Sequence, residues 1–282
     1  MVARLMRFGF AYNPTIEETV DLAERATGWC AMHGIEHWVA QASDFERLVA
    51  ELPGTHALVV LGGDGTFLRA VRAVAEVDVP ILGINLGKVG FLSKAEADEL
   101  IPVLEAIKAG TYTLEERMAL TGVILPGGLP PARPITALND IVVARGSLAR
   151  VVRLDVAIDT SHLATFISDG LIVSSPTGST GYSFSAGGPI LDPSSRNLVV
   201  TPIAGYLSAI RSVVASPHQV VRCRVVDAYE ALVSIDGRED IPIAVGDLVE
   251  VRALARPIRF VEPVGALPFW DLLRTKVQLL PS

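Results

Sequence analysis

The sequence predicts an α/β N-terminal domain, with a doubly wound and mostly parallel sheet, followed by an all-β C-terminal domain. Residues 1–110 alternate short apolar runs with amphipathic segments of helical period, which is typical of a parallel sheet covered on both faces. From residue 111 onward, β-branched runs separated by turn residues replace the helical period, which indicates antiparallel strands. Half of the 282 residues are hydrophobic but only 6% are aromatic, so the apolar content is mainly aliphatic, as in strands buried on both faces.

The helices of the first domain are expected from periodic apolar positions and from the residues at their boundaries. A first helix opens near Asn13, where Thr15 and Glu18 have the spacing of a capping box. Apolar residues recur at helical spacing over residues 67–74, directly after the third expected strand. A last helix is expected over residues 95–108 and ends at a glycine.

Strands are expected wherever apolar and β-branched residues form short runs bounded by turn residues. In the first domain these runs are residues 7–11, 36–40, 57–61 and 80–85. In the second they are residues 119–125, 139–144, 151–159, 165–174, 220–226, 231–235 and 248–253. Helical spacing returns over residues 268–274. We therefore divide the chain into an α/β domain of residues 1–110, a mainly antiparallel β domain of residues 111–256, and a tail of residues 257–282 that packs back on the first domain.

Charge and cysteine content restrict the class of protein. The net charge of −7 argues against nucleic acid or an anionic membrane as a partner. Cys30 and Cys223 are too few for a disulfide framework and are compatible with a reducing cytosol. The longest uncharged stretch, residues 170–191, carries seven Ser and Thr hydroxyls, five glycines and two prolines, so it is a poor membrane span. The sequence also begins without the features of a signal peptide, and we expect a cytoplasmic protein.

The strongest local signal is the Gly-Gly-Asp-Gly-Thr turn at residues 62–66, between an expected strand and an expected helix. Its glycines let the backbone turn tightly and approach a ligand. Backbone N–H groups and the start of the helix then form an anion site suited to phosphate. The carboxylate of Asp64 would repel phosphate, so it should instead accept a proton from a hydroxyl or hold a metal ion. The alternative is a plain turn in which Asp64 or Thr66 caps the helix. The phosphate-binding turn comprises Gly62, Gly63, Gly65 and Thr66.

A second segment, residues 168–189, is dense in hydroxyls and glycines and contains Tyr182. Hydroxyl and backbone groups can bind an adenine edge and ribose oxygens, and Tyr182 can stack on a base. The alternative is a Ser/Gly-rich surface loop, although flexible linkers rarely include Tyr, Phe and Pro so regularly. Asn139 and Asp140 stand at the start of an expected strand, and by themselves they indicate only a turn.

Two common nucleotide-binding motifs are missing. The chain contains no Gly-x-x-x-x-Gly-Lys-Ser/Thr loop, and residues 83–90 do not match the Gly-x-Gly-x-x-Gly dinucleotide fingerprint. Residues 83–90 still end a strand with glycine and carry Lys88, so this segment could line the same crevice or could be a simple loop.

Taken together, the Gly-Gly-Asp-Gly-Thr turn, the Asn139-Asp140 pair and the long motif of residues 168–189 resemble the NAD kinase family. The resemblance extends from residue 13 to residue 274. It implies transfer of the terminal phosphoryl group of ATP, or of polyphosphate, to the 2′-hydroxyl of the adenosine ribose of NAD, which gives NADP. It also implies an active site in the crevice between two domains and a homo-oligomer, dimer or tetramer. Because the motifs carry no obvious cluster of Lys and Arg, we expect a divalent cation, Mg²⁺, to bridge the phosphate oxygens, and we expect it to arrive with ATP and not on side-chain ligands.

The resemblance also implies roles for individual residues. Asp64 would be the catalytic general base on the ribose hydroxyl. The family usually has Asn-Glu where this chain has Asn139-Asp140, so the carboxylate here is shorter by one methylene. The second domain would supply most NAD contacts. The implied NAD-binding residues are Asp64, Gly65, Asn139, Asp140, Arg150, Asp169, Thr180, Gly181, Tyr182, Ser183, Phe184, Ser185, Ala204 and Arg238.

Two other classes of function remain open from the sequence. A lipid or sugar-phosphate kinase of the same superfamily would share the Gly-Gly-Asp-Gly-Thr turn, but it would need an apolar or basic entry, or several cations for a second phosphate. A non-catalytic dinucleotide-binding protein or a dehydrogenase would not explain Asp64 within a glycine turn.

Overall fold

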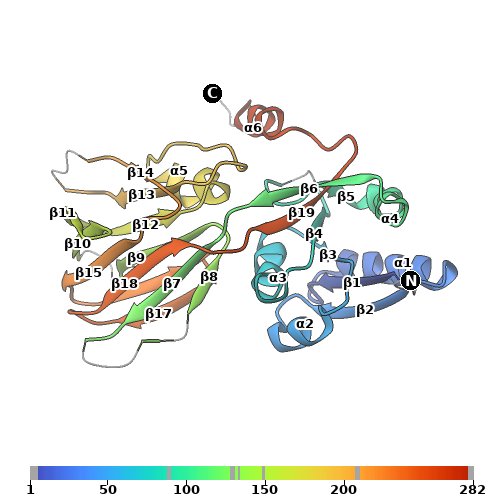
Figure 1. Ribbon diagram of the computed structural model, residues 1–282, viewed down its shortest axis with the longest axis horizontal. Helices are drawn as coiled ribbons and strands as arrows, with labels where there is room; N and C mark the ends of the chain where they lie inside the picture. Colours follow the sequence, from blue (N-terminus) through green and yellow to red (C-terminus); the bar gives the residue numbers. More distant parts are fainter. Residues whose placement is uncertain are drawn as a thin grey trace. The chain divides into compact units, whose positions relative to one another are not determined.

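The computed structural model describes residues 6–87, 90–127, 131–132, 134–147, 150–206 and 210–278. The chain divides into two compact units (Figure 1). The first comprises Met1–Glu116 and Ile258–Ser282, and the second comprises Arg117–Pro257. The sequence predicted the first boundary at residue 110. The difference arises because the chain adds one more strand, β6 (Tyr112–Arg117), to the sheet of the first unit before it enters the second.

The first unit is built on a seven-stranded sheet of described residues, in the order β2-β1-β3-β4-β19-β6 with β5 beside β4. The strands β1 to β4 pair in parallel, and β5 and β19 pair in parallel with β4. The tail therefore contributes a strand to this sheet. Besides β6, the strands are β1 (Arg7–Tyr12), β2 (Glu36–Gln41), β3 (Ala57–Leu61), β4 (Ile81–Asn85), β5 (Ala95–Glu96) and β19 (Ile258–Pro263).

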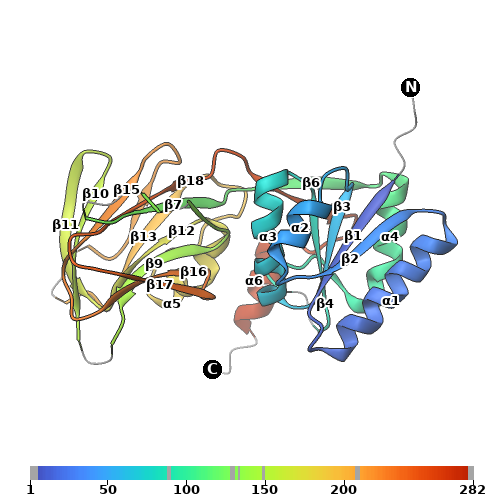
Figure 2. The ribbon, with the colours of Figure 1, turned by 90° about the horizontal axis from the view of Figure 1, so that it is seen from below.

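Helices cover both faces of this sheet (Figure 2). The buried residues of α1 and α4 form one cluster with Phe8, Phe10 and Val59, while α2 and α3 pack on the opposite face. This arrangement explains why β3 is buried along its whole length and reads as a continuous apolar run. The helices are α1 (Glu17–Met32), α2 (Phe45–Glu51), α3 (Asp64–Val77), α4 (Leu100–Ala109) and α6 (Phe269–Gln278), with a short 3₁₀ turn η1 (Ala97–Glu99).

Two boundaries predicted for the first unit are wrong. The N-cap of α1 is Ile16, because the hydroxyl of Thr15 donates to the side chain of Asn13 (3.0 Å) and is not available to the helix. The helix expected over residues 95–108 begins only at Leu100, since Ala95 and Glu96 extend the sheet as β5. Its end is as expected, with Gly110 in the left-handed conformation (φ 72°).

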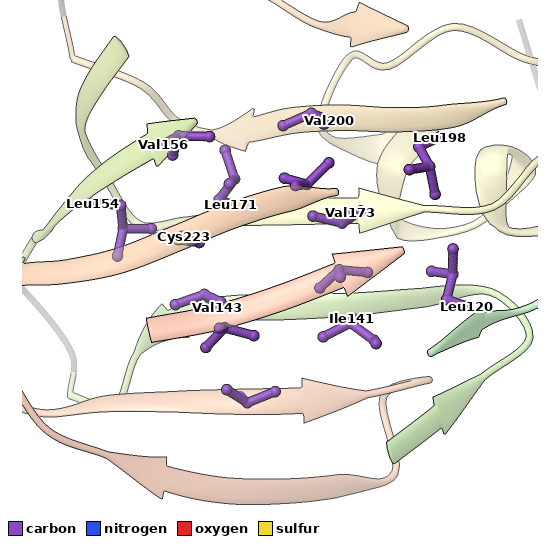
Figure 3. Packing of buried hydrophobic residues seen from close by; sticks show 14 of the residues in the cluster. Leu120, Ile141, Val143, Leu154, Val156, Leu171, Val173, Leu198, Val200 and Cys223 are labelled. Carbon is purple, nitrogen blue, oxygen red and sulfur yellow. The ribbon is translucent and has the colours of Figure 1, made fainter. Parts of the chain in front are cut away.

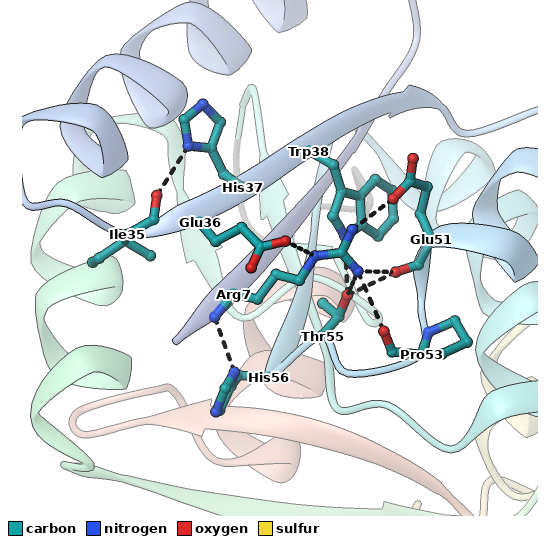
Figure 4. A network of polar contacts seen from close by, with 9 residues as sticks. All are labelled: Arg7, Ile35, Glu36, His37, Trp38, Glu51, Pro53, Thr55 and His56. Carbon is teal, nitrogen blue, oxygen red and sulfur yellow. Dashed lines mark hydrogen bonds and ion pairs between the residues drawn. The ribbon is translucent and has the colours of Figure 1, made fainter. Parts of the chain in front are cut away.

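The amino ends of β1 and β2 are joined through Arg7 (Figure 4). Its guanidinium forms ion pairs with Glu36 (2.7 Å) and Glu51 (2.6 Å), and it also donates to the carbonyl of Pro53 (3.3 Å). Thr55 accepts from the indole of Trp38 (2.9 Å) in the same cluster. This polar network closes the amino edge of the parallel sheet, opposite to the edge where its strands end.

The second unit is a sandwich of two six-stranded sheets, counted over the described residues, whose neighbouring strands pair antiparallel. The sheet orders are β11-β10-β15-β18-β7-β8 and β14-β13-β12-β9-β16-β17. Aliphatic side chains such as Leu120, Ile141 and Leu154 fill the space between the two sheets (Figure 3). The predicted fold class, an α/β domain followed by an all-β domain, is confirmed.

One predicted strand of this unit divides into two. Residues 165–174 contain the end of β11 and all of β12, which belong to different sheets, and Asp169 lies at the break. The strands of the unit are β7 (Leu120–Leu125), β8 (Ile135–Ala137), β9 (Asp140–Arg145), β10 (Val152–Ile158), β11 (Ser161–Ser168), β12 (Gly170–Ser174), β13 (Leu198–Ile203), β14 (Val213–Ala215), β15 (Val221–Asp227), β16 (Ala231–Ile235), β17 (Glu239–Ile243) and β18 (Leu248–Ala253). Two helical turns, η2 (Thr177–Thr180) and α5 (Tyr182–Ser185), follow β12.

Among the described residues, no helix is both long enough and apolar enough to cross a membrane.

Candidate active site

The Gly-Gly-Asp-Gly-Thr turn lies at the carboxyl edge of the parallel sheet, directly after β3. The strand order reverses between β1 and β3, because the chain first adds β2 on one side of β1 and then β3 and β4 on the other. In doubly wound sheets, ligands bind outside the carboxyl ends of the strands at such a reversal. The turn therefore occupies the place in the first unit where the fold itself favours a ligand.

The conformation of this turn depends on Gly62. Its φ of 140° lies in the region that favours glycine, and a β-carbon there would lie 2.9 Å from the hydroxyl oxygen of Thr66. Gly63 is the N-cap of α3, and its carbonyl accepts from the N–H groups of Thr66 (2.9 Å) and Phe67 (3.2 Å). The first N–H groups of a helix have no acceptor within the helix, so this end offers donors to an anion.

Asp64 is the first residue of α3, and its carboxylate is half-buried. The N-cap position belongs to Gly63, so the reading of Asp64 or Thr66 as the N-cap is wrong. The carboxylate faces Gly90, whose α-carbon lies so close that an added β-carbon would be 2.9 Å from the Cγ atom of Asp64. The carboxylate of Asp64 thus lies at the start of α3, directly against the backbone of Gly90.

Asn85, at the end of β4, lies beside the turn and was missed in the sequence analysis. Its Oδ1 atom accepts from the N–H of Leu86 (3.0 Å) and would lie 3.8 Å from a β-carbon on Gly63. The signal was available, because β3 and β4 are consecutive parallel strands whose carboxyl ends lie at the same edge. Lys88, from the same segment, lies outside the described residues.

In the second unit, the Asn139-Asp140 pair is held by Asp236. The fully buried carboxylate of Asp236 accepts three backbone N–H groups, from Leu138 (3.1 Å), Asn139 (2.8 Å) and Asp140 (3.2 Å). Asp236 itself has a left-handed backbone (φ 50°), and its own N–H donates to the carbonyl of Asp140 (3.0 Å). The sequence analysis did not single out Asp236, because Asp-Gly between two strands indicates only a hairpin turn.

The segment after β12 holds the same pair from another side. The N–H of Ser175 donates to the carbonyl of Asn139 (2.8 Å), and its hydroxyl donates to the carbonyl of Leu138 (2.5 Å). Gly178 packs directly on the backbone of Asn139, where a β-carbon would lie 2.6 Å from the α-carbon. Part of the Ser/Gly-rich motif therefore positions Asn139 and Asp140.

A pocket of about 410 Å³ opens beside this pair within the second unit. Tyr182, about half-exposed, contributes to its wall. The outer face of strands β9, β16 and β17 supplies most of the rest. The lining residues are Asn139, Asp140, Val142, Ala144, Tyr182, Leu232, Ser234, Asp236, Gly237 and Asp240. The pocket thus combines an apolar sheet face with convergent carboxyl and hydroxyl groups, which is the usual composition of a small-molecule site.

The two carboxyl groups at this pocket have perturbed acidities. Burial raises the pKa of the Asp140 carboxyl to about 7, and the nearby carboxylate of Asp236 contributes to the rise. Burial also raises the pKa of Asp236, while the three backbone N–H donors and the guanidinium of Arg238 oppose that shift. Arg238 lies 3.7 Å from Asp236. Carboxyls of this kind, in a pocket, are typical of binding and catalytic sites.

Other predicted contacts lie at the opposite end of β9. Asp169 forms a two-contact ion pair with Arg145 (2.9 and 3.3 Å), and its N–H donates to the carbonyl of Ile203 (2.9 Å). Ala204, which follows Ile203, has a left-handed backbone (φ 47°). β9 runs from Asp140 to Arg145, so Arg145 lies roughly 17 Å along the strand from Asp140, at about 3.4 Å per residue, although Ala144 beside it still lines the pocket. The predicted contacts of this unit thus spread along the length of β9.

The remaining predicted contacts differ in exposure. Phe184 and Ser185 are exposed, whereas the hydroxyl of Ser183 is buried against that of Thr201 (3.3 Å) and points into the unit.

Three further predicted contacts make local interactions within the second unit. Arg150 lies with its guanidinium 5.6 Å from the centre of the Tyr229 ring. Thr180 donates its hydroxyl to a carbonyl within η2, and Gly181 is the N-cap of α5.

Comparison with protein-family models identifies the family. The model of the ATP-NAD kinase N-terminal domain matches residues 3–112, and that of the ATP-NAD kinase C-terminal domain matches residues 138–263. The chain belongs to the NAD kinase family. The two matches together cover both the Gly-Gly-Asp-Gly-Thr turn and the Asn139-Asp140 pocket.

Individual relatives agree with this assignment. The chain is 36% identical to the NAD kinase of Dehalococcoides mccartyi over 96% of each chain, and 43% identical to that of Moorella thermoacetica over 81% of this chain and 73% of the relative. It is similar to the crystal structure of yeast NADH kinase complexed with NADH, with a TM-score of 0.84 and 25% identity over 99% of this chain and 88% of that one. An NAD kinase from Archaeoglobus fulgidus in complex with ATP has the same fold (TM-score 0.78, 24% identity, 98% and 100% covered).

The resemblance predicted from the motifs is therefore confirmed. The chain is an NAD kinase, a phosphotransferase with an alcohol group as acceptor, whose substrates are NAD and ATP. The comparisons give no support to a lipid or sugar-phosphate kinase or to a non-catalytic binding protein.

Proposed function

We propose that Asp64 is the general base of this NAD kinase, which removes the proton from the 2′-hydroxyl of the adenosine ribose of NAD as the terminal phosphoryl group of ATP is transferred. The observation that supports this most strongly is the carboxylate at the first position of α3, directly within the phosphate-binding turn. A carboxylate there is unfavourable beside phosphate unless it meets a proton or a cation. Phosphoryl transfer depends mainly on positioning and charge stabilisation, and general-base assistance contributes a further factor of about 10²–10⁴.

The phosphate-binding turn would hold the phosphates of ATP through its backbone. The N–H groups at the start of α3 have no acceptor within the helix and point toward the carboxyl edge of the sheet. The glycines leave this backbone accessible, and Gly65 is exposed. A divalent cation, Mg²⁺, would arrive with ATP and neutralise charge on its phosphate oxygens. We propose no side-chain ligand for it, and among the described residues no group of three or more His, Cys, Asp or Glu side chains has the arrangement of a metal site.

The pocket of the second unit would hold a ribose and its neighbouring groups. With a pKa of about 7, the Asp140 carboxyl can donate a hydrogen bond to a ribose oxygen when protonated or accept one when ionised. Asn139 can do both through its amide. Tyr182, on the wall of the same pocket, offers a ring on which a base can stack.

The test is a coupled assay of NADP formation with purified protein, NAD, Mg²⁺ and either ATP or polyphosphate. The Asp64→Asn variant keeps the shape of the side chain but cannot act as a base, so its turnover should fall by more than about 100-fold while NAD still binds. Retained turnover in this variant would disprove the assignment of the base. The two donors, compared in the same assay, determine whether polyphosphate replaces ATP.

We further propose that the enzyme works as a homo-oligomer, a dimer or a tetramer. The support is the spread of the expected NAD contacts along β9, from Asp140 at one end to Asp169, which pairs with Arg145, at the other, roughly 17 Å along the strand. In an assembly of identical chains, the contacts at the Asp169 end of one copy can serve the pocket of another. Light scattering after gel filtration measures the assembly, and a fully active monomer would contradict the proposal.

We also propose a cytoplasmic location, where both substrates are made available. It is supported by Cys30 and Cys223, which are both free and buried, as in proteins of a reducing compartment. Detection of the protein in fractionated cells tests this directly.

A further inference from the structure

Gly90 lies directly against the carboxylate of Asp64. A β-carbon on Gly90 would be 2.9 Å from Cγ and 3.0 Å from Oδ2 of Asp64, and closer still to Oδ1. Such distances are shorter than real β-carbons tolerate. Gly90 is itself buried, so no solvent-filled space is available into which a side chain could turn. The carboxylate of Asp64 therefore occupies the volume that any other residue at position 90 would need.

Space, and not backbone conformation, is what requires glycine at this position. The φ angle of Gly90 lies outside the left-handed region, unlike that of Gly62 at 140°. A left-handed backbone is therefore not the reason for glycine at position 90. The three heavy atoms nearest to a methyl group at this position would all belong to the Asp64 carboxyl group, at the far end of a side chain that can rotate.

The chain that follows Gly90 is fixed to the sheet. The N–H of Gly90 donates to the hydroxyl oxygen of Ser93 (2.6 Å), which is buried. The backbone of Ser93 packs on β4, since a β-carbon on Gly83 would lie 2.9 Å from its α-carbon. The N–H of Lys94 donates to the carbonyl of Gly83 (3.0 Å).

The side chain of Lys94 adds a second anchor. Its ammonium group forms ion pairs with Glu115 on β6 (2.9 Å) and with Glu262 on β19 (2.6 Å), and it is largely shielded from solvent. The segment is thus tied both to β4 and to the neighbouring strands of the sheet. The backbone at Gly90 consequently cannot readily move away from the carboxylate of Asp64.

We propose that Gly90 is a positioning residue of the reaction: its missing side chain and its anchored backbone determine where the carboxylate of Asp64 points. The proposal rests on the role of Asp64 as general base proposed above. A displacement of about 1 Å in a reacting group can reduce the rate by roughly 100-fold. A methyl group at position 90 would force a displacement of that order, because the carboxylate can yield and the anchored backbone cannot.

The experiment compares Gly90→Ala with Gly87→Ala and Asp64→Asn, each as the full-length protein. Gly87 lies in the same connection, and a β-carbon there meets nothing within 4 Å, so Gly87→Ala is the matched control. We expect Gly90→Ala to lower kcat by about 10- to 100-fold, with the NAD dissociation constant and the melting temperature close to those of the unaltered protein. Gly87→Ala should keep kcat within about twofold.

The outcomes separate this inference from the assignment of the base. If Asp64→Asn is inactive but Gly90→Ala matches Gly87→Ala in kcat, the positioning role is wrong while the base assignment stands. If Asp64→Asn remains active, the base assignment itself fails. A loss in Gly90→Ala that appears mainly in NAD binding also overturns the positioning role, because a displaced base should affect kcat.

A double variant and a second position complete the test. When Gly90→Ala is added to Asp64→Asn, it should lower the residual rate by less than about twofold, since the group on which it acts has already lost its function.

If Gly90→Ala does not fold, Ser93→Ala decides the question, because it removes the hydroxyl that accepts a hydrogen bond from the N–H of Gly90. We expect Ser93→Ala to lower kcat several-fold with unchanged NAD binding, and an unchanged kcat would overturn the proposal.

Discussion

The Gly-Gly-Asp-Gly-Thr turn of the first unit and the Asn139-Asp140 pocket of the second are built in opposite ways. The turn consists of five consecutive residues, 62–66, and its donors belong to its own backbone. The pocket depends on three segments far apart in the sequence, around Asn139, Ser175 and Asp236. A site made from neighbours in the chain is encoded by local residue types, whereas a site made by long-range hydrogen bonds exists only after folding. Substitutions should therefore affect the two regions differently.

The largest effect on activity is expected at Gly62. Alanine there must adopt a φ of 140° and also meets the side chain of Thr66, so we expect a loss of stability of about 1–3 kcal/mol. The displaced N–H donors should reduce kcat/KM by about 100-fold. Thermal unfolding and the NADP assay measure both effects. Gly65→Ala is the control for stability, because a β-carbon there meets nothing within 4 Å. Equal stability of the two variants would contradict the prediction.

The next effect is expected from Asp236→Ala in the pocket. It leaves the N–H groups of Leu138, Asn139 and Asp140 without their acceptor, and each such loss costs about 1–3 kcal/mol. We expect a fall in stability on the order of 3 kcal/mol and a higher KM for NAD. Asp236→Asn retains one acceptor oxygen and should lose less. If both variants lost the same stability, the three hydrogen bonds to Asp236 would not be what holds the Asn139-Asp140 pair in place.

The Asp140 carboxyl predicts a pH dependence of stability. In the unfolded chain the pKa of this carboxyl is near 4, but in the folded protein burial raises the pKa to about 7. Between these values the folded state binds more protons, so the free energy of unfolding should fall as the pH rises and then level off above pH 7. One group contributes at most about 1.4 kcal/mol per pH unit.

Chemical denaturation at several pH values between 4 and 8 measures this slope. In Asp140→Asn the slope should become shallower without vanishing, because the pKa of Asp236 is also raised and contributes in the same direction. An unchanged slope would mean that Asp140 is not the group that retains its proton.

The smallest effect is expected at Tyr182. Its ring lies on the wall of the pocket but is about half-exposed, so its removal should disturb the fold little. Tyr182→Ala should raise KM for NAD by about 3- to 10-fold, the amount that a lost aromatic contact implies, and kcat should change less. Tyr182→Phe keeps the ring and is the control. A fall in kcat without a change in KM would exclude a stacking role.

The elements of the first unit were largely predictable, because their signals lie within short stretches of chain. β3 coincides with the expected residues 57–61, and α3 contains the expected apolar face. The errors occurred where a longer-range contact competed with a local preference. Ala95 and Glu96 have a helix ahead of them but pair with β4, and the hydroxyl of Thr15 bonds to Asn13 instead of capping α1.

The second unit was predictable only at the level of its strands. The run at residues 165–174 is continuous in sequence, yet β11 pairs with β10 while β12 pairs with β9 and β13, so the chain changes sheets at Asp169. Asp-Gly at positions 169 and 170 indicates a turn, but it does not reveal that the chain passes from one sheet to the other. Likewise, Asp-Gly at positions 236 and 237 indicates a turn and does not reveal that the carboxylate of Asp236 accepts three N–H groups from a segment almost 100 residues earlier.

By itself, the sequence determined the fold class and the place of the Gly-Gly-Asp-Gly-Thr turn, since helical period, strand alternation and consecutive glycines act over distances of a few residues. The family followed from the resemblance of three motifs, each of which is a short run of consecutive residues. Only the tertiary structure decided which groups surround the two carboxylates of the site. The close approach of Gly90 to Asp64 and the burial of Asp140 beside Asp236 both depend on segments that meet through folding. Contact distances and burial set the position and acidity of a carboxylate, and neither is a property of the neighbouring residues in the chain.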